Sequence, residues 1–203
     1  MSERKSGKKK FAIDKYYIYL IAIGMIVFCS IINKNFLTYN NFINIFTQMS
    51  FTTIGAFAMT ILLISGVMDL ALGSTMALTG IASVEVYLGT GSMLLAFLVA
   101  IVFGIICDAI TGTLINKLHL HPFIVGLGTK QIYRGIVLLY TGGAVISQVG
   151  DFKMFGQGRL FGTIPYPIIA MLIVMLITWV VLKYTRLGRF CFAVGGNREA
   201  AVA

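Results

Sequence analysis

The segment 66–74 reads GVMDLALGS and places Asp69 between Gly66 and Gly73, with long apolar runs on either side. A carboxylate at the margin of a membrane helix is costly to insert, so its presence requires a structural or a transport role. Because Asp69 precedes an apolar run, it could accept hydrogen bonds from the unpaired N–H groups at a helix N-terminus and meet the positive end of the helix dipole. The two glycines would serve a tight turn. We favour capping for Asp69, and direct contact with a transported substrate is the alternative.

Two further charges interrupt apolar runs that hydropathy predicts to span a membrane. Asp108 lies near the end of the predicted span Met93–Leu114, and Lys130 lies near the beginning of Phe123–Tyr140. In an antiparallel helix pair both fall about 10 Å from the same end, since a helix rises roughly 1.5 Å per residue. Equal depth favours an Asp108–Lys130 ion pair, which would offset two otherwise expensive burials. Arg134 is on the same predicted face as Lys130 and could share the carboxylate or reach a cavity.

Composition indicates which elements must position these residues. Of the 203 residues, 58% are hydrophobic and only 11% are charged, and the mean hydropathy is +0.92. A soluble domain carries about 25% charged residues, so water is the wrong solvent for most of this chain. The sequence predicts an all-α fold, a polytopic transmembrane helix bundle with about six spans. We place these spans at Tyr16–Ile32, Ile43–Ser65, Ser74–Leu88, Met93–Leu114, Phe123–Tyr140 and Ile164–Leu182.

The distribution of charge sets the expected orientation. The net charge is +9, and the basic residues concentrate in an N-terminal arm, residues 1–15, and in the tail after Leu182. This placement is typical of cytoplasmic flanks and not of a nucleic-acid groove, so no nucleic-acid partner is expected. We therefore expect a basic, disordered cytoplasmic arm over 1–15, a membrane region over 16–183, and both ends of this chain in the cytoplasm.

The second predicted span is unusually polar. Gln48, Thr52 and Thr60 are separated by four and eight residues, which puts them on roughly one helix face. A helix with lipid on every side would not carry such a face. Two interpretations stay open, namely hydrogen bonding to neighbouring helices and lining of a transport path.

Nothing in the sequence predicts catalysis. It contains no phosphate-binding GxxxxGK[ST] loop, no HExxH and no GxSxG. His119 and His121 lie in a short predicted loop and are interpreted as solvated turn residues, not as a metal site. Cys29, Cys107 and Cys191 are far apart and read as free thiols. We expect no cofactor, no metal and no enzymatic activity of this chain.

Four motifs nonetheless resemble one family. AMT at 58–60 followed by SGVMDLALGS at 65–74 is similar to the GMT…GGIDLSVGS signature of bacterial ribose-type sugar ABC-importer permeases. PFIVGLGT at 122–129 resembles the PFIVTLGT segment of these permeases, and RG at 134–135 and GG at 142–143 fall at the expected positions. TRLGR at 185–189 and GGNREAA at 195–201 resemble the T-x-x-GR…GGN-x-EAA loop. The order and spacing of the four motifs carry the resemblance.

The resemblance implies a permease subunit in the bacterial plasma membrane. It would pair with a second permease copy, a cytoplasmic ABC ATPase and an extracytoplasmic sugar-binding protein, with ATP hydrolysed on the separate subunit. Residues 184–203 would form the start of a cytoplasmic loop that docks onto the ATPase. The docking residues would be Gly195, Gly196, Asn197, Glu199, Ala200 and Ala201. Gly66, Asp69, Gly73 and Ser74 would belong to the motif near the translocation path.

The chain also departs from the family pattern. Val67 replaces a glycine, Ala71 a serine and Gly126 a threonine. Asp108 and Lys130 stand where small or neutral residues are expected, which fits mutual compensation within the predicted pair or an altered substrate preference. The sequence stops within the docking loop. We therefore expect a truncated permease with an incomplete docking loop.

Two alternatives compete with the importer permease. An ion- or proton-coupled secondary transporter would use Asp69, Glu85 and Asp108 as coupling carboxylates. It is less favoured because such transporters often carry paired inverted repeats with interrupted helices, and only the interruption at 66–73 is found. No chain of further acids and histidines continues from Asp108 either. The third possibility is a nonfunctional fragment that only inserts and packs.

Overall fold

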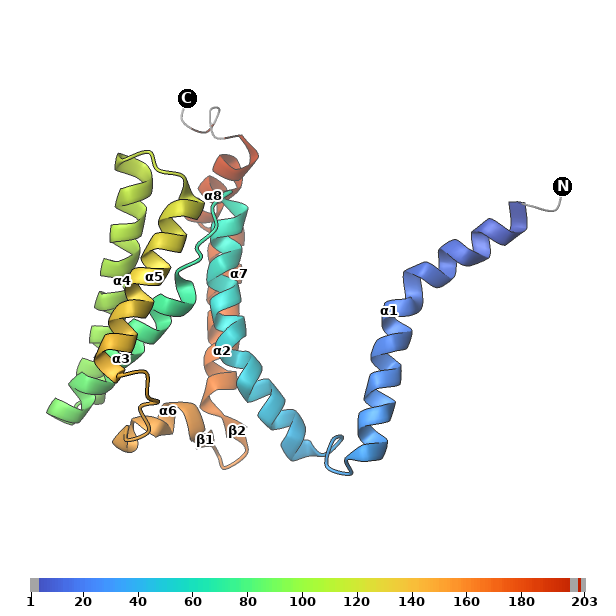
Figure 1. Ribbon diagram of the computed structural model, residues 1–203, viewed down its shortest axis with the longest axis horizontal. Helices are drawn as coiled ribbons and strands as arrows, with labels where there is room; N and C mark the ends of the chain where they lie inside the picture. The colour runs from blue at the N-terminus through green and yellow to red at the C-terminus, as the bar shows by residue number, and fades with distance from the viewer. Residues whose placement is uncertain (1–3, 198–200, 202–203) are drawn as a thin grey trace. The chain divides into compact units, whose positions relative to one another are not determined.

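The computed structural model describes residues 4–197 and 201 of the chain, with side chains described from Tyr16 onward. The chain divides into two compact units, Met1–Phe46 and Thr47–Ala203, and we describe each by itself (Figure 1). The first unit holds helix α1, Arg4–Ile32, and the beginning of α2, Tyr39–Ile64. Since α1 begins at Arg4, the expectation of a disordered arm is wrong for the described part of residues 1–15.

A polar turn joins α1 to α2. The Asn33 side chain accepts a hydrogen bond from the backbone N–H of Asn35 at 2.9 Å, and the Asn41 side chain donates to the carbonyl of Phe36 at 2.7 Å. The Thr38 hydroxyl accepts from the N–H of Asn41 at 3.4 Å, which satisfies one of the free donors at the start of α2. Side-chain hydrogen bonds therefore determine where α2 begins.

The second unit contains the rest of α2 and all later elements. In chain order these are α3 Leu72–Thr90, α4 Met93–Lys117, α5 Pro122–Thr141, the 3-10 helix η1 Gly150–Lys153, α6 Met154–Gln157, β1 Arg159–Leu160, β2 Ile164–Pro165, α7 Tyr166–Tyr184 and α8 Arg186–Gly196. The two short strands form an antiparallel ladder in which Leu160 lies opposite Ile164. Figure 1 shows α8 and the loop between α4 and α5 at one end of this unit, and the η1–α6 and β1–β2 segment at the other.

The structure confirms an all-α membrane helix bundle. A helix occupies each of the six predicted spans: α1 begins twelve residues before its span, and the other helix ends lie within four residues of the predicted ones. Within the described residues, three helices are long and apolar enough to cross a membrane, namely α2, α4 and α7. The apolar part of α1, Tyr16–Ile32, is shorter. The helices α3 and α5 carry more polar residues, and they pack against α4.

The core of the second unit lies between α3, α4 and α5. Its buried cluster consists of Ala71, Leu78, Cys107, Tyr133 and Val137. Two buried hydrogen bonds join the helices: the Ser83 hydroxyl donates to the Ala96 carbonyl at 2.9 Å, and the Tyr133 hydroxyl donates to the Cys107 carbonyl at 3.0 Å. Polar contacts of this kind hold membrane helices together where the surrounding lipid gives no hydrophobic driving force.

Candidate functional site

The break between α2 and α3 comprises residues 65–71. It is formed by Gly66 and by the defined end of α2. Gly66 has a φ of +79°, a left-handed conformation that favours glycine. The N–H of Val67 bonds the Leu62 carbonyl and that of Gly66 bonds the Leu63 carbonyl, both at 3.0 Å. This is the Schellman pattern, so α2 ends at a geometrically fixed point. Gly73 was expected to share the turn, but it lies in the first turn of α3 without a positive φ, and that expectation is wrong.

Asp69 makes a local hydrogen bond inside this break. Its Oδ1 accepts from the backbone N–H of Ala71 at 2.7 Å. Ala71 precedes the first residue of α3, so Asp69 closes an Asx turn that leads into the helix and does not itself cap it. The hydrogen bond occupies one oxygen of the carboxylate and orients the side chain.

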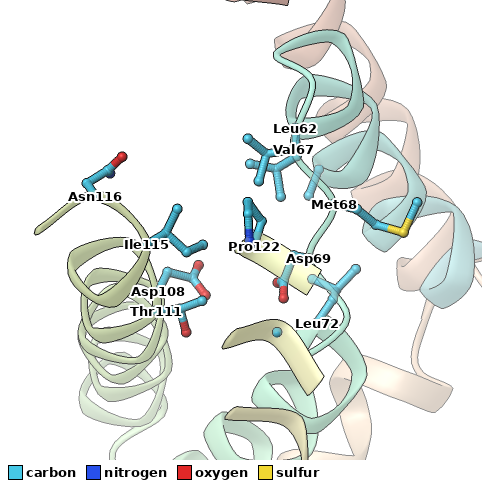
Figure 2. A pocket seen from close by; sticks show the side chains of 13 residues that line it. Leu62, Val67, Met68, Asp69, Leu72, Asp108, Thr111, Ile115, Asn116 and Pro122 are labelled. Atoms are coloured by element: carbon cyan, nitrogen blue, oxygen red, sulfur yellow. The ribbon is translucent and has the colours of Figure 1, made fainter. Parts of the chain in front are cut away.

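A cavity of about 310 Å³ lies beside the break, between α2, α4 and α5 (Figure 2). It is lined from α2 and the break by Ala58, Leu62, Val67, Met68 and Asp69, from the start of α3 by Leu72, from α4 by Asp108, Thr111, Gly112, Ile115 and Asn116, and from α5 by Pro122 and Gly126. The α4 residues recur at helical spacing and form one stripe. Sequence reasoning missed Thr111 and Asn116, although their spacing of three and eight residues from Asp108 predicts the same helix face.

The cavity brings two carboxylates together. Figure 2 shows Asp108 on α4 and Asp69 on the break facing the same space. The two are close enough for their negative charges to interact. Asp69 is half-buried and Asp108 is exposed, so the cavity opens onto the surface of this unit. Water in an open cavity lowers the cost of placing like charges together, and the carboxylates are left as hydrogen-bond acceptors for hydroxyl or ammonium groups.

The Asp108–Lys130 ion pair predicted from equal depth does not form. In the described part of the chain Lys130 is exposed on α5, and the charge near Asp108 is that of Asp69. Arg134 is also exposed and lines a second cavity with Ala77 and Thr141. The two cations and the Asp108 carboxylate therefore face different surroundings, because depth along a helix does not determine the direction of a side chain.

The polar face of α2 lies outside the cavity. Gln48, Thr52 and Thr60 are all exposed, and the Thr60 hydroxyl donates to the carbonyl of Ala56 within its own helix at 2.8 Å. The face of α2 that meets α3 instead uses Gly55, where an added Cβ would be 3.3 Å from a side-chain carbon of Leu72 and 3.8 Å from the sulfur of Met76. The described residues contain no group of three or more metal-ligating side chains.

Comparison with known proteins identifies the class. The sequence profile of a family described as the permease component of the branched-chain amino acid transport system matches residues 41–203. The chain belongs to this permease family. It is 38% identical to the D-allose transport system permease protein AlsC of Escherichia coli K12, over 98% of this chain and 62% of that protein. It is 35% identical to the ribose import permease protein RbsC of Bacillus subtilis 168, over 88% of this chain and 56% of that protein.

A further relative is named for a different substrate. The autoinducer 2 import system permease protein LsrD of Escherichia coli SMS-3-5 is 31% identical over 90% of this chain and 57% of that protein. The chain thus spans less than two thirds of the length of these curated relatives. No solved structure matches the chain. The family assignment confirms the resemblance to sugar importer permeases, and the chain is a multi-pass membrane protein.

Within this permease the motif residues gather around the break. Gly126, from the motif at 122–129, lies against the backbone of Leu70, and a Cβ added there would be 3.2 Å from the Leu70 nitrogen. Ser74 is buried in the first turns of α3. Three helices therefore meet at the break, and close backbone packing accounts for the glycine at position 126.

The segment expected to dock the ATPase begins with α8. Thr185 caps this helix by accepting from the N–H of Gly188 at 3.4 Å. Gly195 and Gly196 form its last two residues, Asn197 follows, and the N–H of Ala201 bonds the Asn197 carbonyl at 3.1 Å. The predicted docking residues Glu199 and Ala200 lie outside the described residues.

Proposed function

We propose that this chain forms the membrane path of an ATP-driven importer for a sugar or a similarly hydroxylated solute. It would act as the permease subunit together with a second copy, a cytoplasmic ABC ATPase and an extracytoplasmic solute-binding protein. The observation that carries the proposal is family membership, supported by allose and ribose permeases that match most of this chain. The permease itself performs no chemistry, and ATP hydrolysis belongs to the separate subunit.

The exposed polar face of α2 is the proposed wall of the path. Gln48, Thr52 and Thr60 are exposed in this chain, and a membrane helix gains nothing by showing such a face to lipid. A second copy of the permease would enclose that face and provide a polar route between the two subunits. The open cavity with Asp69 and Asp108 would lie beside this route, with carboxylate oxygens able to accept hydrogen bonds from solute hydroxyls.

The cavity end of the second unit is proposed to face the cytoplasm of a bacterium, with both ends of this chain on that side of its plasma membrane. Arg186 and Arg189 lie on α8, at the same end as the loop after Lys117 (Figure 1). Lysine and arginine favour the cytoplasmic side of a bacterial inner membrane. Lys183 lies 5.1 Å above the ring of Trp179 at the end of α7, and this type of cluster is enriched at the membrane–water interface. α8 and residues 195–201 would then be available to an ATPase in the cytoplasm.

Reconstitution tests the proposal. The permease should copurify with an ABC ATPase from the same cell and should show ATP hydrolysis that its binding protein stimulates. Uptake assays with labelled D-allose, ribose and leucine would then separate a sugar importer from an amino-acid importer. Sugar uptake that requires ATP supports the proposal. ATP-dependent uptake of leucine alone would overturn the substrate class, and failure to bind any ATPase would overturn the mechanism.

One observation favours a second candidate, a proton-coupled transporter. Asp69 and Asp108 face one cavity, and carboxylates within membrane segments often mark proton pathways. The experiment is uptake into proteoliposomes under an imposed proton gradient without ATP. Accumulation that follows the gradient would establish the second candidate, and accumulation that requires ATP would exclude it.

A further inference from the structure

Gly195, the second-to-last residue of α8, lies against the end of α2. A Cβ added at Gly195 would collide with the carbonyl of Ile64 and would be 3.4 Å from the Cα of Ser65. A Cβ added at Gly196, the next residue, would have no neighbouring atom within 4 Å. The close contact is therefore a property of position 195 and not of the glycine pair as a whole.

The contact falls on the helix end that leads into the break. The Schellman bonds of α2 use the carbonyls of Leu62 and Leu63, and the N–H of Ser65 bonds the Ile61 carbonyl at 3.2 Å. The Ile64 carbonyl is left outside these bonds, and Gly195 lies against it. Beyond Ile64 the chain continues through Gly66 directly to Asp69 in the cavity wall. A displacement of α8 against Ile64 thus acts a few residues away from the cavity carboxylate.

The other end of α8 is fixed as well. A Cβ at Gly188 would collide with the carbonyl of Leu182 near the end of α7, and the Thr185 hydroxyl donates to the Val181 carbonyl at 2.7 Å. Gly188 and Gly195 are seven residues apart, so they lie on the same face of α8. Phe190 projects from a different face and is exposed. The helix is therefore held against α7 and α2 on one face and leaves another face open.

We propose that Gly195 is a positioning residue of the importer: by lacking a side chain it lets α8 rest on the end of α2, so that movement of α8 moves the break and Asp69. This inference rests on the proposed function, because it assigns α8 to the ATPase side. It adds the route from that side to the cavity, through backbone contact at Ile64 and Ser65.

The test compares Gly195→Ala with Gly80→Ala in the permease assembled with its ATPase and binding protein. Both changes add one methyl group to a helical glycine, but a Cβ at Gly80 on α3 would have nothing within 4 Å, and only the one at Gly195 meets backbone. Gly195→Ala should reduce ATP-dependent uptake at least about 5-fold while the ATPase still copurifies, and Gly80→Ala should stay within about 2-fold of the parent. Equal uptake by the two variants would overturn the inference. Absence of the ATPase from the parental preparation would instead overturn the proposed function.

A second readout reports on the break itself. Val67 lines the cavity, so a Val67→Cys chain can be labelled with a water-soluble maleimide in a background where Cys29 and Cys191 are serine. Gly195→Ala should change the labelling rate at position 67 several-fold, whereas Gly80→Ala should not. A purely structural defect would lower accumulation of the protein without a selective change at this position.

A measurement without any change at Gly195 covers the case in which Gly195→Ala does not accumulate. Labelling of Val67→Cys is compared with and without bound ATPase, and Val145→Cys serves as the control because Val145 is 90% exposed in the loop after α5. Binding of the ATPase should alter labelling at position 67 more than at position 145. The same rate at position 67 with and without bound ATPase would overturn the inference.

Discussion

The carboxylates of the cavity and the cations of α5 are two charged regions of one bundle with opposite surroundings. Asp69 and Asp108 come from different elements and face one cavity. Lys130 and Arg134 lie on a single helix and are exposed. Charges of opposite sign thus lie at similar depths in neighbouring helices without pairing, while like charges face each other. The difference shows that the cavity, and not charge neutralisation, determines where the carboxylates point.

The physical reason is access to water. An ion pair buried in a membrane stabilises little beyond the cost of removing both charges from water. An open cavity avoids that cost, and an exposed lysine or arginine can extend toward headgroups, water or a partner subunit. Each of these four charged side chains therefore has polar surroundings that do not depend on an ion pair. Substitutions in each region test whether the two are as independent as this geometry indicates.

The largest effect is expected at Asp69, because its carboxylate both closes the Asx turn and lines the cavity. Asp69→Ala removes the acceptor for the Ala71 N–H and the carboxylate together, and should lower stability by about 1 kcal/mol and uptake by roughly tenfold. Asp69→Asn keeps an acceptor oxygen and removes only the charge. It should be at least as stable as the parent, because it keeps the Asx turn and relieves repulsion with Asp108, and it should lose part of the uptake. If both variants are equally destabilised, the Asx turn does not explain the role of Asp69.

A double-mutant cycle compares the two regions directly. Asp69→Asn and Asp108→Asn should each relieve repulsion, and the double variant should gain less than the sum by about 1 kcal/mol. Asp108→Asn and Lys130→Gln should add within roughly 0.5 kcal/mol, because these side chains share no contact. The free energy of unfolding in a detergent titration provides the measurement. Strong coupling between Asp108 and Lys130 would restore the ion pair that the sequence predicted.

Hydrogen bonding distinguishes the inward face of α5 from its outward face. The Tyr133 hydroxyl donates to Cys107 within the core, and Tyr133→Phe should cost about 0.6–1 kcal/mol. Tyr140 is exposed near the end of the same helix and interacts with Glu85. Tyr140→Phe should cost clearly less, since an exposed hydroxyl exchanges its partner for water. Equal losses in thermal midpoint would show that the two faces of α5 contribute alike.

Much of this arrangement followed from the sequence. Hydropathy located the six long helices α1 to α5 and α7, because an apolar run of the right length in a membrane has no alternative to a helix. The break at Gly66 and a hydrogen-bonding role for Asp69 were predictable from residue type. The direction of Asp108 was not, because depth follows from counting residues whereas direction depends on which helices pack. The contact of Gly195 with Ile64 joins residues far apart in sequence, and no local sequence pattern predicts it.

The smallest effect is expected at the glycines of α5, and it tests how tightly the cavity region is packed. A Cβ at Gly126 would be 3.2 Å from the Leu70 nitrogen, whereas one at Gly128 would have nothing within 4 Å. In a helix, alanine is favoured over glycine by about 0.8–1.0 kcal/mol. Gly128→Ala should therefore stabilise the permease by up to that amount. Gly126→Ala should gain a few tenths of a kcal/mol less or become destabilising, because the break must shift to accept the methyl group. Thermal midpoints of the two variants measure the difference. Equal stabilisation would mean that the break yields freely at Leu70, and the cavity region would then be no more constrained than the exposed face of α5.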